Sequence, residues 1–231
     1  DANIRNPETF SENLKSVRPD VVVNLAALIG TLLSTVPVRE MFDTNTIGNL
    51  NVAYAARGAG ARGFVFTSST VVHGENKKGE HHGRFSLFAP KHSYSASKAA
   101  AEYALQQFAR EEGSMPVVTL RPPMVIGEGT DIPLPPIEFV RDLLKGKEIQ
   151  LFGEGLHERE YVSVADVASG IWKAVEWSVS APKGYHPFFL TGNRISMRDL
   201  AQAAVKKLGG KVTHAPSTAQ AFSLTSDPSD T

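Results

Sequence analysis

Short apolar runs alternate with longer helical stretches along this chain, and this alternation constrains its fold more than any other feature. The runs at 21–26, 63–66 and 117–120 are rich in valine, phenylalanine and leucine, whereas 37–57 and 92–112 have helical patterns. A continuous apolar run is typical of a parallel strand buried on both faces. Strands separated by helices form βαβ units with right-handed crossovers. The sequence therefore predicts an α/β fold with a Rossmann-like, doubly wound parallel sheet.

Shorter elements follow this region, and proline and glycine become more frequent after residue 120. Helices are predicted at 7–17, 137–145, 164–177 and 197–208, and strands at 149–152, 161–164 and 188–190. We expect residues 1–125 to form a partial dinucleotide-binding domain, with residues 160–190 returning to its sheet. Residues 126–231 are expected to form mainly a small C-terminal substrate-binding lobe.

Composition excludes several classes of protein. Lys+Arg and Asp+Glu both number 24, so no net positive charge favours nucleic acid or an anionic membrane. The chain has no cysteine, which removes disulfides and thiolate zinc sites. No apolar run of about 18 residues could span a bilayer, and no signal peptide is visible. We therefore expect a cytoplasmic protein without a nucleic-acid or membrane partner.

Glu80, His81 and His82 could suggest a metal site. They lie beside Lys77 and Lys78 in a polar loop, without a third ligand at helical spacing. Structural and catalytic zinc sites need three or four well-placed ligands. A solvated loop is the better interpretation, and no metal is expected.

Tyr94 and Lys98 place a phenol and an ammonium four residues apart at the start of an alanine-rich helical stretch. On a helix, residues i and i+4 lie on the same face, one turn apart. An ammonium beside a phenol favours the phenolate and lowers a pKa that is ordinarily about 10. Such a tyrosine can donate or accept a proton near neutral pH. The pair indicates proton transfer to a substrate oxygen, although a helix can also carry this spacing by chance.

Other polar residues follow the predicted strands at the same edge of the sheet. Asn24 lies near the end of the first strand, residues 68–70 end the second, and Arg121 follows the third. In an open parallel sheet, ligands bind outside the carboxyl ends of the strands. Because Tyr94 begins a helix just after one of these loops, we predict that it faces a ligand site at this edge.

Several short motifs are weak individually but specific in their combined order and spacing. They are Asn24–Ala27, Asn45–Gly48, Thr67–Ser69, Val72–Gly74, Tyr94–Lys98, Leu120–Pro122 with Gly127, and Arg159–Asp166. From residue 3 to about residue 208, the chain resembles the extended branch of the short-chain dehydrogenase/reductase superfamily, the NAD-dependent epimerase/dehydratase family. That branch includes nucleotide-sugar epimerases, dehydratases and reductases.

The resemblance implies roles for individual residues. It makes Tyr94 the general acid/base, Lys98 the residue that binds the nicotinamide ribose and lowers the tyrosine pKa, and Ser69 the hydroxyl that holds the substrate oxygen. The implied cofactor-binding residues are Asn3, Ile4, Leu25, Ala26, Ala27, Asn45, Thr67, Ser68, Tyr94, Lys98, Pro123 and Val125. The implied substrate-binding residues are Ser69, Thr70, Met124 and Arg159.

Some of these assignments have structural alternatives. Asn45 is interpreted mainly as a structural hydrogen-bonding residue inside its helix, with a low weight as a cofactor contact. Ala26 and Ala27 let a cofactor lie against the main chain, but small residues also serve tight strand packing. Arg159 matches the family arginine that meets a nucleotide diphosphate, and it could instead pair with a neighbouring glutamate. Ser68 is expected to face the cofactor.

The largest departure from the family pattern is the missing glycine-rich turn that binds pyrophosphate at a helix N-terminus. No G-x-x-G-x-x-G motif occurs in the chain, which also does not begin with Met. We expect a fragment whose first strands and glycine-rich turn precede Asp1. The residue that selects the cofactor would also lie there, so NAD is expected from the epimerase branch and NADP is not excluded.

The function implied by the resemblance is a NAD-dependent epimerase of nucleotide sugars. Thr70 and Val71 stand where dehydratases of this branch have Asp-Glu, which argues against dehydration. Met124 replaces a common asparagine and weakens the nucleotide-sugar assignment, whereas Arg159 supports it. The alternatives are a dehydrogenase or reductase of a hydroxysteroid-like or other secondary alcohol, and a non-catalytic cofactor-sensing or scaffold protein.

A homodimer is also implied by the resemblance. The small-residue face of the 92–112 helix allows close approach of another helix, and with the 37–57 helix it could form a four-helix interface. Packing within the chain, against the sheet, competes for part of that surface.

Overall fold

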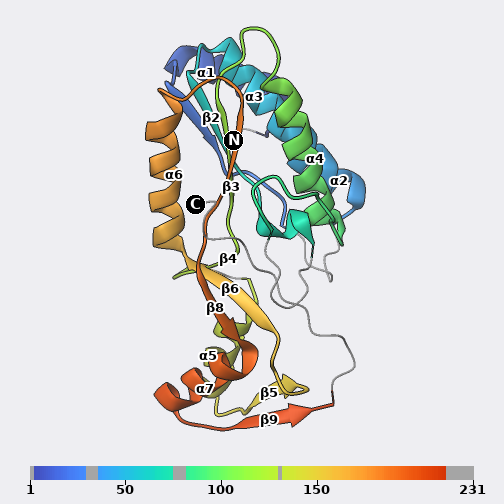
Figure 1. Ribbon diagram of the computed structural model, residues 1–231, viewed down its shortest axis with the longest axis vertical. Coiled ribbons are helices and arrows are strands. Elements are labelled where there is room, and N and C mark those ends of the chain that lie inside the picture. The colour runs from blue at the N-terminus through green and yellow to red at the C-terminus, as the bar shows by residue number, and fades with distance from the viewer. Residues whose placement is uncertain (1–2, 30–35, 75–81, 130–131, 217–231) are drawn as a thin grey trace.

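A four-stranded parallel sheet forms the centre of the larger part of the molecule, in the computed structural model of Figure 1. The structure describes residues 3–29, 36–74, 82–129 and 132–216. The strand order is β1-β2-β3-β7, with all neighbours parallel. These strands are β1 at Val21–Asn24, β2 at Gly63–Thr67, β3 at Val117–Arg121 and β7 at Tyr185–Phe189.

Helices cover both faces of this sheet, as Figure 1 shows. One face carries α1 (Ser11–Val17), α3 (Asn49–Gly58) and α4 (Ser93–Phe108), and the other carries α6 (Val164–Ser178). Phe64 and Phe66 pack in the first of these layers, while Val65 packs against α6. Because β2 is buried on both sides, its central residues Phe64, Val65 and Phe66 are all apolar. The predicted doubly wound parallel α/β fold is confirmed.

The helix predicted over 37–57 consists of three segments instead of one. They are α2 (Val38–Phe42), a π-helical segment η2 (Asp43–Gly48), and α3. Asn45 lies in the π-helical segment, and its amide bonds the backbone N and O of Leu28 at 2.8 and 2.9 Å. Wider turns of this kind are frequent at functional sites. The departure from α-helical geometry thus accompanies a contact with the loop that follows β1.

The helix predicted over 7–17 is also divided. A 3-10 turn, η1 (Pro7–Thr9), precedes α1, and the two meet at Phe10. Asn6 caps the first turn by accepting a hydrogen bond from the backbone of Glu8. The ring of Phe10 is 7% exposed and belongs to the core formed with α3 and α4. Phe10 is therefore buried at the point where the two helical segments meet.

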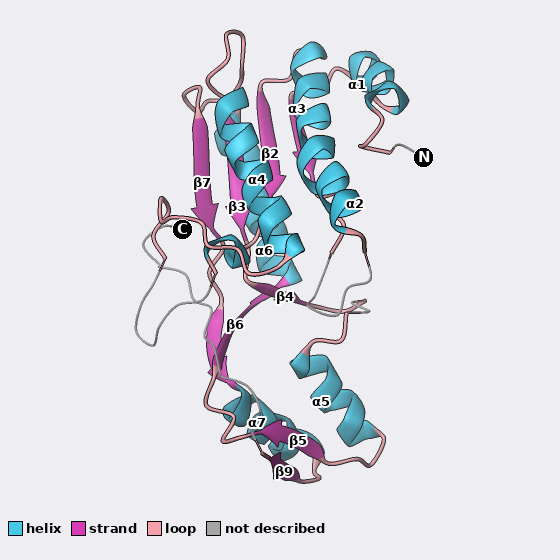
Figure 2. Cartoon of the chain, turned by 90° about the vertical axis from the view of Figure 1, so that its right-hand side faces the viewer, coloured by secondary structure: helices cyan, strands magenta, loops and turns pink. Residues whose placement is uncertain are grey.

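A smaller group of elements lies below the carboxyl ends of the four strands, as seen in Figure 2. It contains α5 (Pro135–Leu144), α7 (Met197–Leu208), and the parallel pair β5 (Ile149–Phe152) and β9 (Val212–Ala215). Their apolar side chains form a separate core cluster that includes Ile149, Leu151 and Met197. This cluster is separate from the core of the four-stranded sheet. The division into a dinucleotide-binding domain and a substrate-binding lobe stays a prediction.

A second sheet, β4-β6-β8, joins the two parts of the molecule. Its strands are β4 (Met124–Ile126), β6 (Glu158–Ser163) and β8 (Asn193–Ser196). The strand predicted at 161–164 therefore begins earlier and pairs with β4 and β8, not with the four-stranded sheet. Residues 160–190 are expected to return to the four-stranded sheet. From this segment, β7 pairs within that sheet and α6 covers one of its faces.

In the described residues, no helix is long and apolar enough to cross a membrane.

Gly192→Ala should destabilise the connection between the two parts. An added Cβ would lie 2.1 Å from the carbonyl oxygen of Tyr161, which lies opposite Asn193 in the β6–β8 pair. Because this oxygen belongs to the backbone, relief requires opening the pair, and we expect a loss of about 1–3 kcal/mol in the free energy of unfolding. Urea denaturation measures it. Gly58→Ala is the control, since no described atom lies within 4 Å of its added Cβ, and equal losses would contradict the prediction.

Candidate active site

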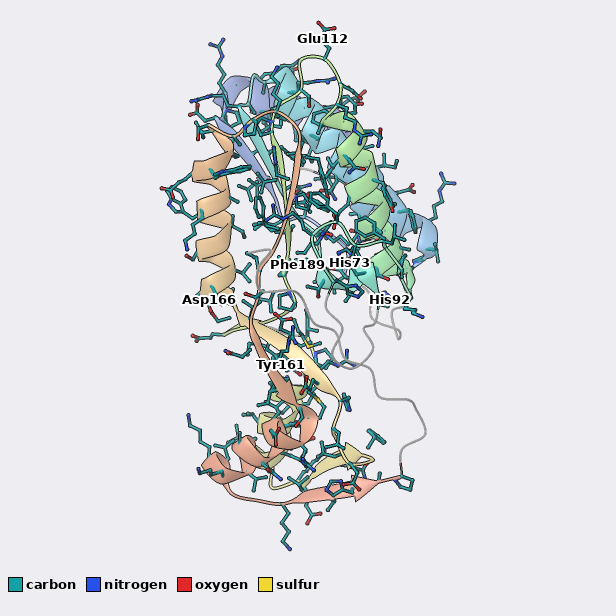
Figure 3. All side chains as sticks on the ribbon, in the orientation of Figure 1. His73, His92, Glu112, Tyr161, Asp166 and Phe189 are labelled. Carbon is teal, nitrogen blue, oxygen red and sulfur yellow. The ribbon has the colours of Figure 1, made fainter. Side chains whose placement is uncertain are left out.

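The first turn of α4 places Tyr94 at the carboxyl edge of the four-stranded sheet. A reciprocal cap fixes this turn: the backbone N of Ser95 donates to Nδ1 of His92 at 3.2 Å, and the backbone N of His92 donates to Oγ of Ser95 at 3.2 Å. Figure 3 shows His92 at the lower end of α4, on the side of the smaller lobe. Two satisfied backbone donors stabilise this helix start, so the position of Tyr94 is set by the fold.

Tyr94 has a raised pKa, not the lowered one that its spacing from Lys98 predicts. Burial raises the pKa of Tyr94 to about 12, and a hydrogen-bonding contact with Ser69 lowers it only in part. Nζ of Lys98 lies 6.0 Å from the centre of the phenol ring. The predicted direction is wrong for this chain because loss of hydration disfavours the phenolate more than the nearby groups favour it.

Lys98 is buried beneath the tyrosine and is only 2% exposed. Its Nζ donates to the backbone O of Thr67 at 2.8 Å and lies 4.8 Å from the ring centre of Phe66. Burial lowers the pKa of Lys98 to about 8, while the charge of Glu102 raises it. An ammonium has three donors, and Thr67 accounts for one of them. The group can therefore also donate to a ligand hydroxyl at this edge.

Ser69 and Thr70 occupy the turn that follows β2. Ser69 caps the 3-10 helix η3 (Thr70–His73), since its Oγ accepts from the backbone N of Val71 at 3.4 Å. Thr70 is 6% exposed, and its backbone N donates to the backbone O of Pro122 at 3.1 Å. The structure therefore brings Ser69, Tyr94 and Lys98 together, whereas Thr70 is buried in the turn.

His73 closes this turn and lies at the same end of the sheet as Phe189 in Figure 3. Their ring centres are 5.6 Å apart. Burial lowers the pKa of His73 to about 3, and the charge of Arg121 is the second largest cause of this fall. A histidine with such a pKa is neutral at ordinary pH, so it packs as an aromatic residue and adds no charge to the site.

The predicted cofactor residues after β1 are open to a ligand. Leu25 is 57% exposed, Ala26 is exposed and Ala27 is half-buried. Near the chain start, Asn3 is exposed, and the backbone O of Ile4 accepts from Asn51 at 3.0 Å. Ala26 and Ala27 give this loop small side chains at the carboxyl edge, which suit an extended ligand lying against the main chain.

Two other predicted cofactor residues direct their side chains elsewhere. Asn45 is fully buried, and its amide donates both to Sδ of Met41 in the same helical stretch at 3.2 Å and to Oγ of Ser97 at 3.0 Å, which agrees with the predicted structural role. Ser68 donates to Glu102 at 2.5 Å. The expectation that the Ser68 side chain faces a cofactor is wrong, because its hydroxyl is satisfied in the core. Oγ of Thr67 lies 3.4 Å from the backbone O of Asn24.

The predicted substrate residues on β4 and β6 lie at the junction with the smaller lobe. Met124 packs against the apolar cluster that contains Tyr161. Pro123 and Val125 are half-buried beside it. Arg159 is half-buried on β6, close enough for its charge to oppose the burial that raises the pKa of Tyr161 to about 12. These residues thus lie on the strands below the carboxyl edge.

Glu80 and His81, considered above as metal ligands, lie outside the described residues. The ring of His82 stacks on that of His73, with 5.0 Å between the ring centres.

One group of buried polar residues beside the site has no counterpart in the sequence predictions. Glu102, 1% exposed on α4, pairs with Arg121, 2% exposed at the end of β3, with 2.6 Å between Oε2 and Nη2. Oε2 also accepts from the hydroxyl of Tyr185 at 2.5 Å. The signal available in the sequence was helical spacing, because Tyr94, Lys98 and Glu102 recur every four residues on one face.

A pocket of about 530 Å³ lies on the opposite face of the sheet. It is lined by residues of α6 and β7 that include Lys173, Trp177 and Phe188. Tyr94, Lys98 and Ser69 do not line it. The chemistry of the carboxyl edge, with its hydroxyl, phenol and ammonium groups, defines the candidate site better than the size of this pocket.

A doubly wound parallel sheet with a serine, tyrosine and lysine at its carboxyl edge defines the class of nicotinamide-dependent short-chain oxidoreductases. The sequence model of the NAD dependent epimerase/dehydratase family matches residues 1–186. The chain belongs to this family, as its motifs predict.

Individual relatives agree with the family assignment. A UDP-glucose 4-epimerase of Erwinia amylovora is 26% identical over 85% of this chain and 64% of its own length. An uncharacterised Methanocaldococcus jannaschii protein is 28% identical over 71% of this chain and 50% of its own length. The chain thus spans about half to two thirds of these curated relatives. A solved UDP-glucose 4-epimerase of Thermus thermophilus, in complex with NAD, has a TM-score of 0.81 and 26% identity, covering 99% of this chain and 75% of that one.

Proposed function

We propose that the protein is a NAD-dependent epimerase of nucleotide sugars, with Tyr94 as its acid/base. The observation that carries the proposal is the convergence of Ser69, Tyr94 and Lys98 at the carboxyl edge of the sheet. Relatives named as UDP-glucose 4-epimerases support the substrate class. A positioned phenol can exchange a proton with a secondary alcohol, a neighbouring hydroxyl can hold the alcohol oxygen, and a cation can stabilise the phenolate. Tyr94, Ser69 and Lys98 offer these three groups.

The residues act together on one substrate carbon. Ser69 donates to the substrate oxygen and orients it toward the phenol oxygen of Tyr94. Tyr94 takes the hydroxyl proton as the carbon–hydrogen bond breaks, and it returns the proton when the ketone is reduced on its other face. Bound NAD supplies the acceptor and then the donor of the hydride, so the two steps balance without net oxidation. Lys98, the neighbouring cation, stabilises the phenolate.

The residues present fit a nicotinamide cofactor. The exposed 25–27 segment offers main chain and small side chains, and Lys98 combines a buried ammonium with donors beyond the one used by Thr67. Asn3, Ile4, Pro123 and Val125 extend the proposed contact surface on either side. NAD is favoured because it is the cofactor in the solved epimerase complex, and NADP is the alternative that a cofactor titration tests.

Arg159 is the proposed contact for the diphosphate of the substrate. Its half-buried guanidinium lies on β6, whereas the neighbouring Glu160 accepts from the backbone N of Gly192 at 2.7 Å. Arginine suits phosphate because its planar group offers several donors in a fixed geometry. Thr70 and Met124 complete the proposed substrate set, Met124 through apolar contact.

A dehydrogenase of a less polar secondary alcohol is the second candidate. The apolar segment of Pro122, Pro123 and Met124 favours it, because a diphosphate sugar would meet little polarity there. The same Tyr94 chemistry would then end with the reduced cofactor instead of returning the hydride. The two functions differ in their net redox change.

A redox balance experiment separates the candidates. The intact protein with NAD and UDP-glucose should interconvert the sugar epimers while the absorbance of reduced cofactor stays flat after the first turnover. Products are followed by chromatography of the nucleotide sugars. Steady accumulation of reduced cofactor with a secondary alcohol would establish the dehydrogenase instead, and no turnover with any substrate would favour a cofactor-sensing or scaffold protein.

A homodimer through α2–α3 and α4 is part of the proposal. Ile47, Tyr54 and Tyr103 are 50%, 42% and 52% exposed on these helices. Large apolar and aromatic side chains gathered on neighbouring helices favour burial against another protein surface. A second copy of this chain would supply the same surface, as symmetric interfaces do.

A further inference from the structure

Glu102 is the centre of a buried polar cluster formed by Ser68, Glu102, Arg121 and Tyr185. Oε1 accepts from Oγ of Ser68 at 2.5 Å and from Nε of Arg121 at 3.1 Å. Oε2 accepts from Nη2 of Arg121 at 2.6 Å and from the hydroxyl of Tyr185 at 2.5 Å. A carboxylate has about four acceptor positions, so these donors satisfy both oxygens. A fully satisfied buried network is rigid and specifies one arrangement.

The cluster joins the two segments that carry the candidate catalytic groups. Tyr94, Lys98 and Glu102 lie one turn apart on the same face of α4. The end of β2 meets this face at three successive residues. The backbone O of Thr67 accepts from Lys98, Oγ of Ser68 donates to Glu102, and Ser69 contacts Tyr94. Ser68 lies in the sequence between Thr67, the last residue of β2, and Ser69.

We propose that Glu102 is a positioning residue that holds Ser69 against Tyr94 and Lys98 by fastening the end of β2 to α4. This inference rests on the proposed function, since it concerns the geometry of the same acid/base group. Arg121 fixes the carboxylate from β3, and its Nη1 also donates to the backbone O of Arg84 at 2.7 Å. Small displacements of a reacting group lower the rate steeply. Loss of the buried contact between Ser68 and Glu102 should therefore lower turnover, although Glu102 lies two turns from Tyr94.

The charge of Glu102 acts on Lys98 as well. Both side chains are almost fully buried, and the carboxylate opposes the fall in the lysine pKa that burial causes. The ionisable groups around this pair come from three elements: Tyr94 on α4, Arg121 on β3 and Tyr185 on β7. From β2, Lys98 meets the carbonyl of Thr67 and the ring of Phe66. Glu102 lies one turn further along the same face of α4.

Glu102→Gln tests the proposal because the amide keeps the shape and removes the charge. We expect kcat to fall by on the order of tenfold or more while KM changes little, since the substrate contacts remain. The midpoint of Lys98 deprotonation should also fall below the wild-type value. It is followed by NMR of the 13C-labelled lysine side chains, with Lys98→Ala identifying the signal.

Glu111→Gln is the matched control. Glu111 also accepts from a tyrosine and an arginine, Tyr54 at 2.5 Å and Arg57 at 2.8 Å, but in an exposed position after α4. The same chemical change there should alter neither kcat nor the Lys98 midpoint. Equal effects of the two substitutions would overturn the proposal, as would wild-type kcat and midpoint in Glu102→Gln.

Ser68→Ala provides a second test if Glu102→Gln does not fold. It removes one hydroxyl and leaves Arg121 and Tyr185 on the carboxylate. We expect kcat to fall several-fold with an unchanged Lys98 midpoint, because the charge stays in place, and an unchanged kcat would overturn the positioning role. If the wild-type protein shows no turnover, the proposed function fails. The contact between Ser69 and Tyr94, followed by NMR in Ser68→Ala, then decides the inference, and a contact equal to that in wild type overturns it.

Discussion

Tyr94→Phe should lower the rate of hydride transfer by roughly 10²–10⁴-fold, the usual contribution of a positioned acid/base. Phenylalanine keeps the ring and its stacking on His92, whose ring centre is 6.1 Å away. It removes only the hydroxyl that contacts Ser69 and exchanges the substrate proton. The measurement is single-turnover formation of reduced cofactor in the intact protein with saturating substrate.

Cofactor affinity should change little in Tyr94→Phe, because Lys98 and the 25–27 segment stay in place. Titration of NAD by calorimetry checks this. Tyr103→Phe is the matched control, since it makes the same change on the same helix at a residue that is 52% exposed. It should turn over at the wild-type rate. Wild-type turnover by Tyr94→Phe would refute the assignment of the acid/base.

The pH response of Tyr94 follows from its burial. A pKa of about 12 keeps the phenol protonated at neutral pH, ready to donate a proton. Acceptance of a proton near neutral pH requires additional positive charge or hydrogen bonds to the phenolate. Lys98 supplies that charge only while it is protonated, which holds below its pKa of about 8. Activity in the oxidation direction should therefore fall as Lys98 loses its proton, above about pH 8.

The central sheet was predictable because its strands are buried on both faces. Phe64, Val65 and Phe66 form a run that no exposed segment would carry, and the structure buries all three. The short strands β4, β8 and β9 were not predicted. They have three or four residues each, half-buried for the most part, so their apolar pattern is weak. The π-helical turn at Asn45 depends on Leu28 and Ser97, which are distant in the sequence.

The candidate site was predictable in position but not in its electrostatics. Strand ends in a parallel sheet share one edge, which is why Ser69 and Tyr94 could be placed together from the sequence. The pKa of Tyr94 depends on how much water the folded chain removes, and helical spacing carries no such information. The family resemblance predicts that Ser68 faces the cofactor. The sequence does not reveal its actual partner, because Glu102 is 34 residues away.

Arg121→Met should destabilise the protein by about 3–5 kcal/mol, because it leaves the carboxylate of Glu102 buried without its cation. The remaining donors, Ser68 and Tyr185, are neutral and compensate only in part. Guanidinium denaturation gives the free energy of unfolding. Arg57→Met is the control, since the Arg57–Glu111 pair has side chains 29% and 41% exposed. Exposed pairs contribute much less than buried ones, and an equal loss in both variants would contradict the prediction.

Adding Glu102→Gln to Arg121→Met separates the buried charge from lost packing. The amide is neutral, its oxygen can accept from one of the two hydroxyls of Ser68 and Tyr185, and its NH2 can donate to the oxygen of the other. The double variant should therefore be more stable than Arg121→Met alone. Residues in direct contact show such non-additivity, by about 0.5–3 kcal/mol. Strict additivity would mean that the cost of Arg121→Met comes from packing around Phe88 and Phe189, whose ring centres lie 5.3 and 5.4 Å from the guanidinium carbon. Non-additivity would instead assign that cost to an uncompensated charge at Glu102.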